Sequence, residues 1–346
     1  MNNFLRSVLP IVCITLMSAL KAQTFNSGVE YLSYIGEQYS LISEDSWSYI
    51  RAASHSNSAR KIDKRRITLI STIGAAKQKI EKLDGYNGNT TYRDAVVEYM
   101  TIDYQVMTED YAKIVDMEAI AEQSYDNMEA YMLAKQLSRE KLSKASDKVQ
   151  KEQATFAEAN RIKLNENNSE RSKKIEISNK VYEHYNEVYL IFFKNLKQEL
   201  YMLEACSSGN VNGIEQNKNA LQSSVSEGMR GLIRMKPYQG DKSMIESTKT
   251  LFKFYKEEIA SSNKVTSFFL KKENFERVKA AFDKIKSSKR TQADVDKYNK
   301  ALNEYNQGIN EYNNYSNTLN KRRTKLIDDW NRTAHKFTDE HVPKGK

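Results

Sequence analysis

The residues that most often interrupt helices are scarce in this sequence. Its 346 residues include 3 Pro and 12 Gly, whereas an average usage of about 5% would supply about 17 prolines. β-Sandwiches and α/β domains need frequent turns, and Pro and Gly are the residues that most often form them. The composition therefore disfavours those classes and predicts long helices joined by few connections.

The first 22 residues hold a short apolar run and have the pattern of a cleaved secretory signal peptide. Arg6 precedes an apolar run over about residues 8–20, and Ala22 ends a cleavage site before Gln23. The run is shorter than the about 20 residues that span a bilayer. We therefore expect residues 1–22 to be removed from an exported protein, periplasmic or at the cell surface, with no transmembrane segment left.

Cysteine is scarce as well, with two residues in the whole chain. Removal of residues 1–22 would take away Cys13 and leave Cys206 without an intramolecular disulfide partner. It would also remove two bases, which lowers the formal net charge of +9 to +7. Two alternatives stay open: an uncleaved membrane anchor, and lipidation of Cys13, which Val12 disfavours because lipidation requires a small residue there.

The patterns that carry common catalytic and metal chemistry are absent. The four histidines (His55, His184, His335 and His341) form neither a Glu-x-x-His nor a His-Glu-x-x-His pattern. There is no Gly-x-Ser-x-Gly elbow and no glycine-rich phosphate loop. We therefore expect no catalytic residue, no metal, no cofactor and no enzymatic activity. A hydrolase whose His, Asp and Glu residues meet only in the fold is the alternative.

Apolar residues recur at alternating intervals of three and four, which places them along one face of a helix. Turn-forming residues gather at 84–89, 166–169, 207–213 and 236–241. This pattern predicts an all-α, elongated antiparallel helical bundle. The recurring residues are Leu32, Ile35, Tyr39, Ile42, Ser46, Tyr49 and Ala53; Ile62, Arg66, Leu69, Ile73, Ala76, Ile80 and Leu83; and Tyr298, Leu302, Tyr305, Ile309, Tyr312, Ser316 and Leu319.

The chain matches itself at a constant offset of 152 residues between 59–89 and 211–241. Leu69 corresponds to Leu221, and the Tyr-x-Gly sequences that follow correspond as well. Since one helix face resembles another, the shared turn is the stronger sign of duplication. We expect two halves of about four helices each, over 28–165 and 170–335, followed by a flexible basic tail over 336–346. After the turn the match weakens, and about ten extra residues would make Leu164 correspond to Leu326.

The two Tyr-x-Gly loops are our candidate interaction sites. The residues concerned are Tyr86, Gly88, Asn89, Tyr238, Gly240 and Asp241. We expect each glycine to adopt a positive φ angle and each tyrosine to fold back on the end of the bundle; a ligand role for these loops is the alternative.

Charge is divided between two stretches of opposite sign. Residues 94–129 hold ten acids and one base, whereas residues 246–290 hold twelve bases and six acids. The two faces either attract each other, within or between chains, or are simply solvated. Within the basic stretch, the candidate basic face comprises Lys271, Lys272, Lys279 and Arg290. Two further basic clusters, at 60–66 and 321–325, could meet a polyanion or a cell-envelope polymer; we expect no nucleic acid partner.

The signal peptide, the single mature cysteine, the helices rich in Tyr, Lys and Asn, and the lack of catalytic motifs resemble uncharacterised exported helical surface or periplasmic proteins of double-membrane bacteria. This resemblance implies a non-enzymatic module that binds a protein partner, self-associates or acts as a scaffold. The alternative is a protein that binds a small molecule or an anionic polymer in a cleft between the two halves.

Overall fold

The protein is all-α, as the helical period predicts. The structure is a computed structural model that describes residues 24–55, 58–110, 120–164 and 169–345. Helices account for the regular structure of these residues, and the only β-type contacts there are isolated bridges within two turns. The predicted signal peptide, residues 1–22, lies outside them.

The first half of the chain forms an antiparallel bundle, the first bundle. It consists of α1 (Gly28–His55), α2 (Ala59–Glu81), α3 (Thr91–Gln105) and α5 (Tyr125–Ala159), with a π-helical turn η1 (Val106–Asp110) after α3. On α2 the predicted core residues are buried, from Leu69 to Leu83. On α1 the predicted core residues Ile35 and Ile42 are buried, whereas Tyr31, Trp47 and Ala52 are buried in place of their predicted neighbours, and Ala53 is exposed.

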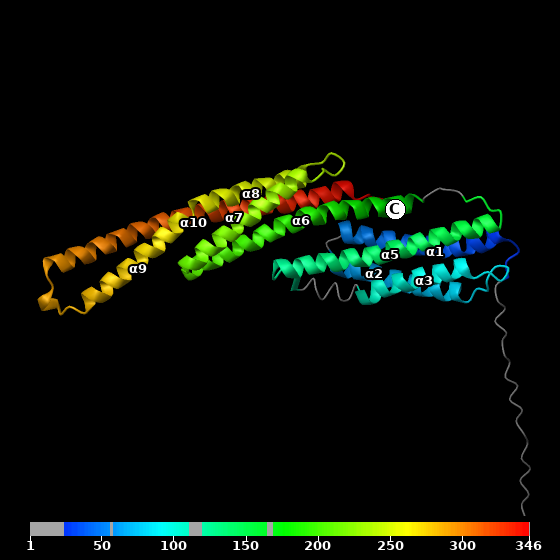
Figure 1. The fold of residues 1–346 in the computed structure, drawn as a ribbon, viewed down its shortest axis with the longest axis horizontal. Coiled ribbons are helices and arrows are strands. Elements are labelled where there is room, and N and C mark those ends of the chain that lie inside the picture. Colours follow the sequence, from blue (N-terminus) through cyan, green and yellow to red (C-terminus); the bar gives the residue numbers. More distant parts are fainter. Residues whose placement is uncertain (1–23, 56–57, 111–119, 165–168, 346) are drawn as a thin grey trace, which may run out of the picture.

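The second half forms a second bundle together with a projecting hairpin. The second bundle consists of α6 (Glu170–Ser208), α7 (Val211–Arg234), α8 (Ser243–Ser261) and the C-terminal part of α10 (Gln292–His341). Residues 263–319 comprise α9 (Asn263–Asp283), the short turn η2 (Ser287–Lys289) and the first part of α10. The base of this segment packs on the ends of α6 and α7 through Val265 and Phe269, and the rest extends past those ends (Figure 1). We call this segment the arm.

The two bundles are staggered along the long axis of the molecule (Figure 1). The start of α6 lies along α1, where Arg171 donates to the carbonyl oxygen of Ser40 over 3.3 Å and the Tyr182 hydroxyl donates to Ser54 over 2.8 Å. Farther along α6, Lys197 donates to the carbonyl oxygen of Glu122 over 2.8 Å. The molecule is therefore elongated, and the halves overlap instead of stacking strictly end to end.

The C-terminal segment differs from the flexible tail that we expected over 336–346. Helix α10 continues to His341, Phe337 is buried, and Val342 is 1% exposed. The carbonyl oxygen of Gly345 accepts hydrogen bonds from Trp47 Nε1, at 3.2 Å, and from Arg51. Apolar residues within the predicted tail explain the difference, because they join the second core while the last residues contact α1.

Candidate functional surfaces

The two Tyr-x-Gly loops are the same tight turn. In the first, the Asn89 amide donates to the carbonyl oxygen of Tyr86 over 3.0 Å, and the intervening Asn87 and Gly88 have φ angles of 51° and 79°. Positive φ at both central positions defines a type I′ turn. The second loop repeats this arrangement: the Tyr238 carbonyl oxygen accepts from Asp241 over 2.8 Å, with φ angles of 49° and 88° between them.

Each turn also begins the next helix in the same way. The Asn89 side chain accepts a hydrogen bond from the Thr91 amide at 2.9 Å, and the Asp241 side chain accepts one from the Ser243 amide at 2.7 Å. These bonds satisfy amides in the first turns of α3 and α8 that lack an intrahelical partner. Asn89 and Asp241 therefore have a structural role in both loops.

The turn tyrosines pack inward in both bundles. The Tyr86 ring lies 5.7 Å from Phe156 of α5, and the Tyr238 ring lies 5.9 Å from Phe337 of α10. The expectation that each tyrosine folds back on its bundle is confirmed. Phe156 and Phe337 thus make the same kind of contact with the two turns. The duplication, and with it the correspondence of Leu164 with Leu326, stays a prediction.

The surroundings of the two turns differ. The second turn lies against the C-terminal end of α10, where His341 Nε2 lies 2.8 Å from an Asp241 carboxylate oxygen. Although burial raises the pKa of Asp241, hydrogen bonds from His341 and Ser243 hold it below its usual value. Where the first bundle meets the second, His55 Nδ1 of α1 lies 3.3 Å from an Asp339 carboxylate oxygen of α10. Burial lowers the pKa of the nearby His184.

An ion triad is buried in the second bundle. Arg323 of α10, which is 8% exposed, contacts both Glu199 of α6 and Glu258 of α8. Glu199 is 0% exposed and Glu258 is 2% exposed. The remaining oxygen of each carboxylate is buried without a hydrogen-bond partner. Two carboxylates and one guanidinium would carry a net charge of −1, so the site favours one bound proton.

Because the two carboxyls lie side by side, that proton belongs to the pair. Burial, followed by the neighbouring Glu199, raises the pKa of Glu258 to about 8, although Arg323 opposes the shift. The triad lies one helical turn before Ser262, where α8 gives way to α9. Its position is therefore the root of the arm.

Stacked aromatic rings hold the arm together. Phe268, Phe275 and Phe282 of α9 face Tyr312, Tyr305 and Tyr298 of α10, with ring centroids 4.5, 5.1 and 4.7 Å apart. Each series steps by seven residues, and the two run in opposite directions, as an antiparallel coiled coil requires. Ala301 and Gly308 are buried beside this ladder, and a β-carbon on Gly308 would lie 3.1 Å from the Lys271 side chain.

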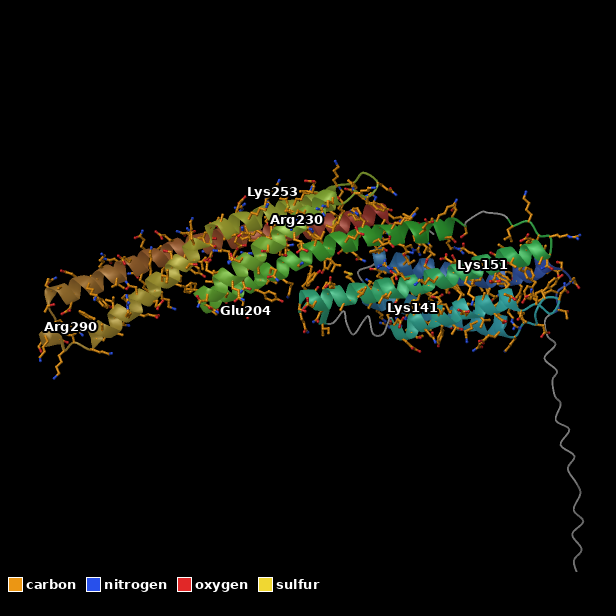
Figure 2. The ribbon with its side chains drawn as sticks, in the orientation of Figure 1. Lys141, Lys151, Glu204, Arg230, Lys253 and Arg290 are labelled. Carbon is orange, nitrogen blue, oxygen red and sulfur yellow. The ribbon has the colours of Figure 1, made fainter. Side chains whose placement is uncertain are left out.

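The predicted basic face lies on the arm but is not uniform. Lys271 pairs with Glu311 at 3.5 Å, and Lys272 lies 3.9 Å from Glu276. Lys279 is exposed near the tip. Arg290 lies at the far end of the arm (Figure 2), where its guanidinium covers the Phe282 ring at 4.2 Å. The tip is therefore the less neutralised part of this face.

Part of the acidic stretch is paired within its own half. Lys148 of α5 donates to Glu98 over 2.5 Å, and Lys141 donates to Asp110 over 2.8 Å. Residues 111–119 of this stretch lie outside the described residues. These two acids therefore pair with lysines of α5, which lie outside the basic stretch over 246–290.

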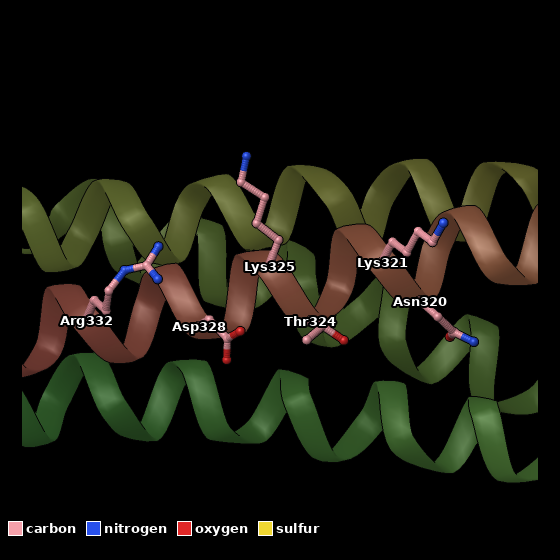
Figure 3. Close-up of a pocket in the computed structure, with 6 residues that line it drawn as sticks. All are labelled: Asn320, Lys321, Thr324, Lys325, Asp328 and Arg332. Carbon is pink, nitrogen blue, oxygen red and sulfur yellow. The ribbon is translucent and has the colours of Figure 1, made fainter.

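Two surface hollows border these charged regions. One, of about 410 Å³, lies between α3, η1 and α5 beside Lys141 and Lys148. The other, of about 470 Å³, follows α10 (Figure 3), with Lys321, Lys325 and Arg332 on one side of the helix and Asp328 on the other. Neither hollow lies between the two bundles, where the alternative hypothesis places a ligand.

Chemical groups for catalysis are sparse in the described part of the chain. No group of three or more His, Cys, Asp or Glu side chains there has the arrangement of a metal site. Cys206 is a free thiol, and burial raises its pKa to about 11, so it is protonated at neutral pH. None of the described helices combines the length and apolar character needed to cross a bilayer.

The chain has no match among family models, curated proteins or solved structures.

Proposed function

We propose that the chain is a non-enzymatic binding or scaffold module that uses the arm as its contact element. The observation that supports this most is the arm itself, a two-helix projection beyond the bundle whose core is a ladder of half-buried rings. Val265 and Val278 are the buried residues of α9. Such a projection adds little to the main core, and ring stacking instead gives it a fixed register.

The expectation that the protein is exported to the periplasm or cell surface belongs to this proposal. A stiff arm suits a protein that must hold one contact point away from its body. The overlap of α6 with α1 supports the same function, because the hydrogen bonds there tie the two bundles into one elongated unit.

The proposal is tested by photo-crosslinking in the source cells. A photoreactive residue at Ser288, at the tip of the arm, should yield one discrete crosslinked product, whether with a protein partner, a second copy or a lipid. The same residue at Lys151, an exposed position on α5, is the matched control. Equal crosslinking from both positions, or none from Ser288, would contradict a contact role for the arm.

A second variant tests whether the contact requires an ordered arm or only the residues at its tip. Phe275→Ala with Phe282→Ala removes two of the stacked rings and should abolish the Ser288 crosslink. Trp330 reports the fold of the second bundle independently, because it is buried and stacks on Phe192 at 3.8 Å. An unchanged crosslink in this variant would show that an ordered arm is unnecessary.

A further inference from the structure

The tip of the arm carries a concentrated positive charge. Residues 277–300 contain eight bases and three acids, which leaves a net charge of +5 on 24 residues. The eight bases are Arg277, Lys279, Lys284, Lys286, Lys289, Arg290, Lys297 and Lys300. This density exceeds that of the whole chain, whose net charge is +9 over 346 residues.

The acids at the tip leave this charge unneutralised. Two of the three acids accept hydrogen bonds from uncharged groups at the start of α10: Asp294 accepts from the Thr291 amide at 2.9 Å, and Asp296 accepts from Gln292 at 2.9 Å. The third acid, Asp283, is exposed, and the pKa of Asp294 is lowered mainly by its hydrogen bonds with Thr291 and only in a minor way by Lys297. The salt bridges of the described residues include none with the six lysines of the tip. The lysines are therefore available to external anions.

The lysines surround the end of the hairpin. Lys279 belongs to α9, Lys284 and Lys289 to the connection, and Lys297 to the first turns of α10. Charges distributed around a rounded end can meet a flat surface together, whereas a linear polymer would need a row along a helix or a groove. The contact is electrostatic, because Phe282, at the end of the ring ladder, is half-buried instead of protruding.

From this arrangement we propose that the tip binds the surface of an anionic, phosphate-bearing lipid bilayer. The inference rests on the proposed function and names the partner of the arm. Lysine suits this contact because its ammonium group acts as a point charge toward phosphates, without needing a fixed pairing geometry. Each base near an anionic membrane surface contributes about fivefold to binding, so three bases contribute roughly a hundredfold.

The test is cosedimentation of the purified mature chain with lipid vesicles. Vesicles of phosphatidylcholine containing about one third phosphatidylglycerol should bind the protein, and vesicles of phosphatidylcholine alone should not. Raising the salt concentration from about 0.1 M to about 0.5 M should release it, because exposed charges are screened. Binding to both vesicle types, or binding that resists salt, would overturn the proposal.

Charge-reversal variants locate the contact. The variant with Lys284→Glu, Lys286→Glu and Lys289→Glu should lower binding by at least about a hundredfold. The control variant with Lys151→Glu, Lys173→Glu and Lys253→Glu has the same net charge and alters exposed lysines on the bundles; Figure 2 labels Lys151 and Lys253. Equal losses in the two variants would show that binding follows total charge and would contradict a site at the tip.

Two further outcomes separate this inference from the proposed function. Tip-dependent binding to heparin or single-stranded DNA without vesicle binding would overturn the lipid surface as the partner. A discrete Ser288 crosslink to a protein, again without vesicle binding, would leave the contact role of the arm intact while rejecting the membrane.

Discussion

The first and second bundles differ most in the charged groups that they bury. Among its described residues the first encloses a single carboxyl, Asp103, whose pKa burial raises to about 7. The second encloses Glu199, Glu258 and Arg323 together. A lone buried carboxyl can be accommodated by taking up a proton, whereas two carboxyls beside a guanidinium form a network that tolerates few rearrangements.

This difference lies where the second bundle departs from the first in shape. The triad joins α6, α8 and α10 at the root of the arm, and the first bundle has no corresponding projection among its described residues. We therefore interpret the triad as fixing the register of the three helices from which the arm extends. In this hypothesis the buried triad determines the direction of the arm and does not by itself raise the stability of the bundle.

The largest expected effect comes from removing the cation of the triad. Arg323→Leu leaves two buried carboxyls without their partner and should lower the free energy of unfolding of the second bundle by about 3–5 kcal/mol. In the first bundle, Asp103→Asn replaces a carboxyl that can bind a proton with a neutral amide of similar shape, so it should lower the free energy of unfolding much less. Urea unfolding followed by the fluorescence of Trp330, in a Trp47→Phe background, reports the second bundle, and amide hydrogen exchange in α2 reports the first.

A compensated variant tests why Arg323→Leu is destabilising. Adding Glu199→Met and Glu258→Met removes the orphaned charges, and apolar replacements of buried ion networks are often neutral or stabilising. Most of the lost stability should therefore return. If it does not, the cost of Arg323→Leu arises from packing and not from unpaired charge.

The next effect is a pH dependence of stability. The pKa of Glu258 is about 8 in the folded protein and 4.5 ordinarily, so the folded state binds the proton that the unfolded state has released. Stability of the second bundle should therefore fall as pH rises from about 4.5 to about 8, by at most about 1.4 kcal/mol per pH unit.

The slope is measured as the difference between the native chain and Glu258→Gln at each pH. This comparison cancels the opposite contribution of His184, whose lowered pKa makes stability rise with pH below its ordinary value of 6.5. An equally steep pH dependence in Glu258→Gln would place the titrating group elsewhere. In the first bundle, Asp103→Asn should remove a decline between about pH 4 and about pH 7.

Much of the fold was predictable because local patterns determine it. The period of α2 identifies core residues such as Leu69 and Ile73, and the Tyr-x-Gly sequences mark both turns. The stagger of the bundles was not predictable, because it depends on contacts such as Tyr182 with Ser54, which are 128 positions apart in sequence. Neither side chain carries a local sign of that contact.

The sequence contains patterns that correspond to the triad and to the ring ladder, but each pattern also fits another structure. Glu199 lies between the buried residues Asn195 and Met202, on the core period of α6, although a glutamate in a charge-rich helix ordinarily indicates a solvated face. The seven-residue spacing of Phe268 and Phe275 matches that of the tyrosines on α10. Pairing the two series required knowing that α9 and α10 are adjacent.

A smaller effect concerns the glycine of each turn. Gly88 and Gly240 have φ angles of 79° and 88°, and a β-carbon on either would meet no atom within 4 Å. Alanine should therefore cost only backbone strain, about 1–2 kcal/mol at either turn. Urea midpoints of Gly88→Ala and Gly240→Ala check this. A markedly unequal loss would show that the two turns, although alike in geometry, are constrained differently by the residues around them.

The smallest expected effect lies at the residue before each of these glycines. Asn87 and Gln239 have φ angles of 51° and 49° and are both exposed. Asparagine tolerates this left-handed conformation better than glutamine, because its short side chain can bond locally to the backbone. Gln239→Asn should therefore stabilise the second bundle by about 0.5 kcal/mol, and Asn87→Gln should destabilise the first by a similar amount. Shifts of the same sign in the two urea midpoints would show that surroundings, and not the shared turn geometry, decide the preference at this position.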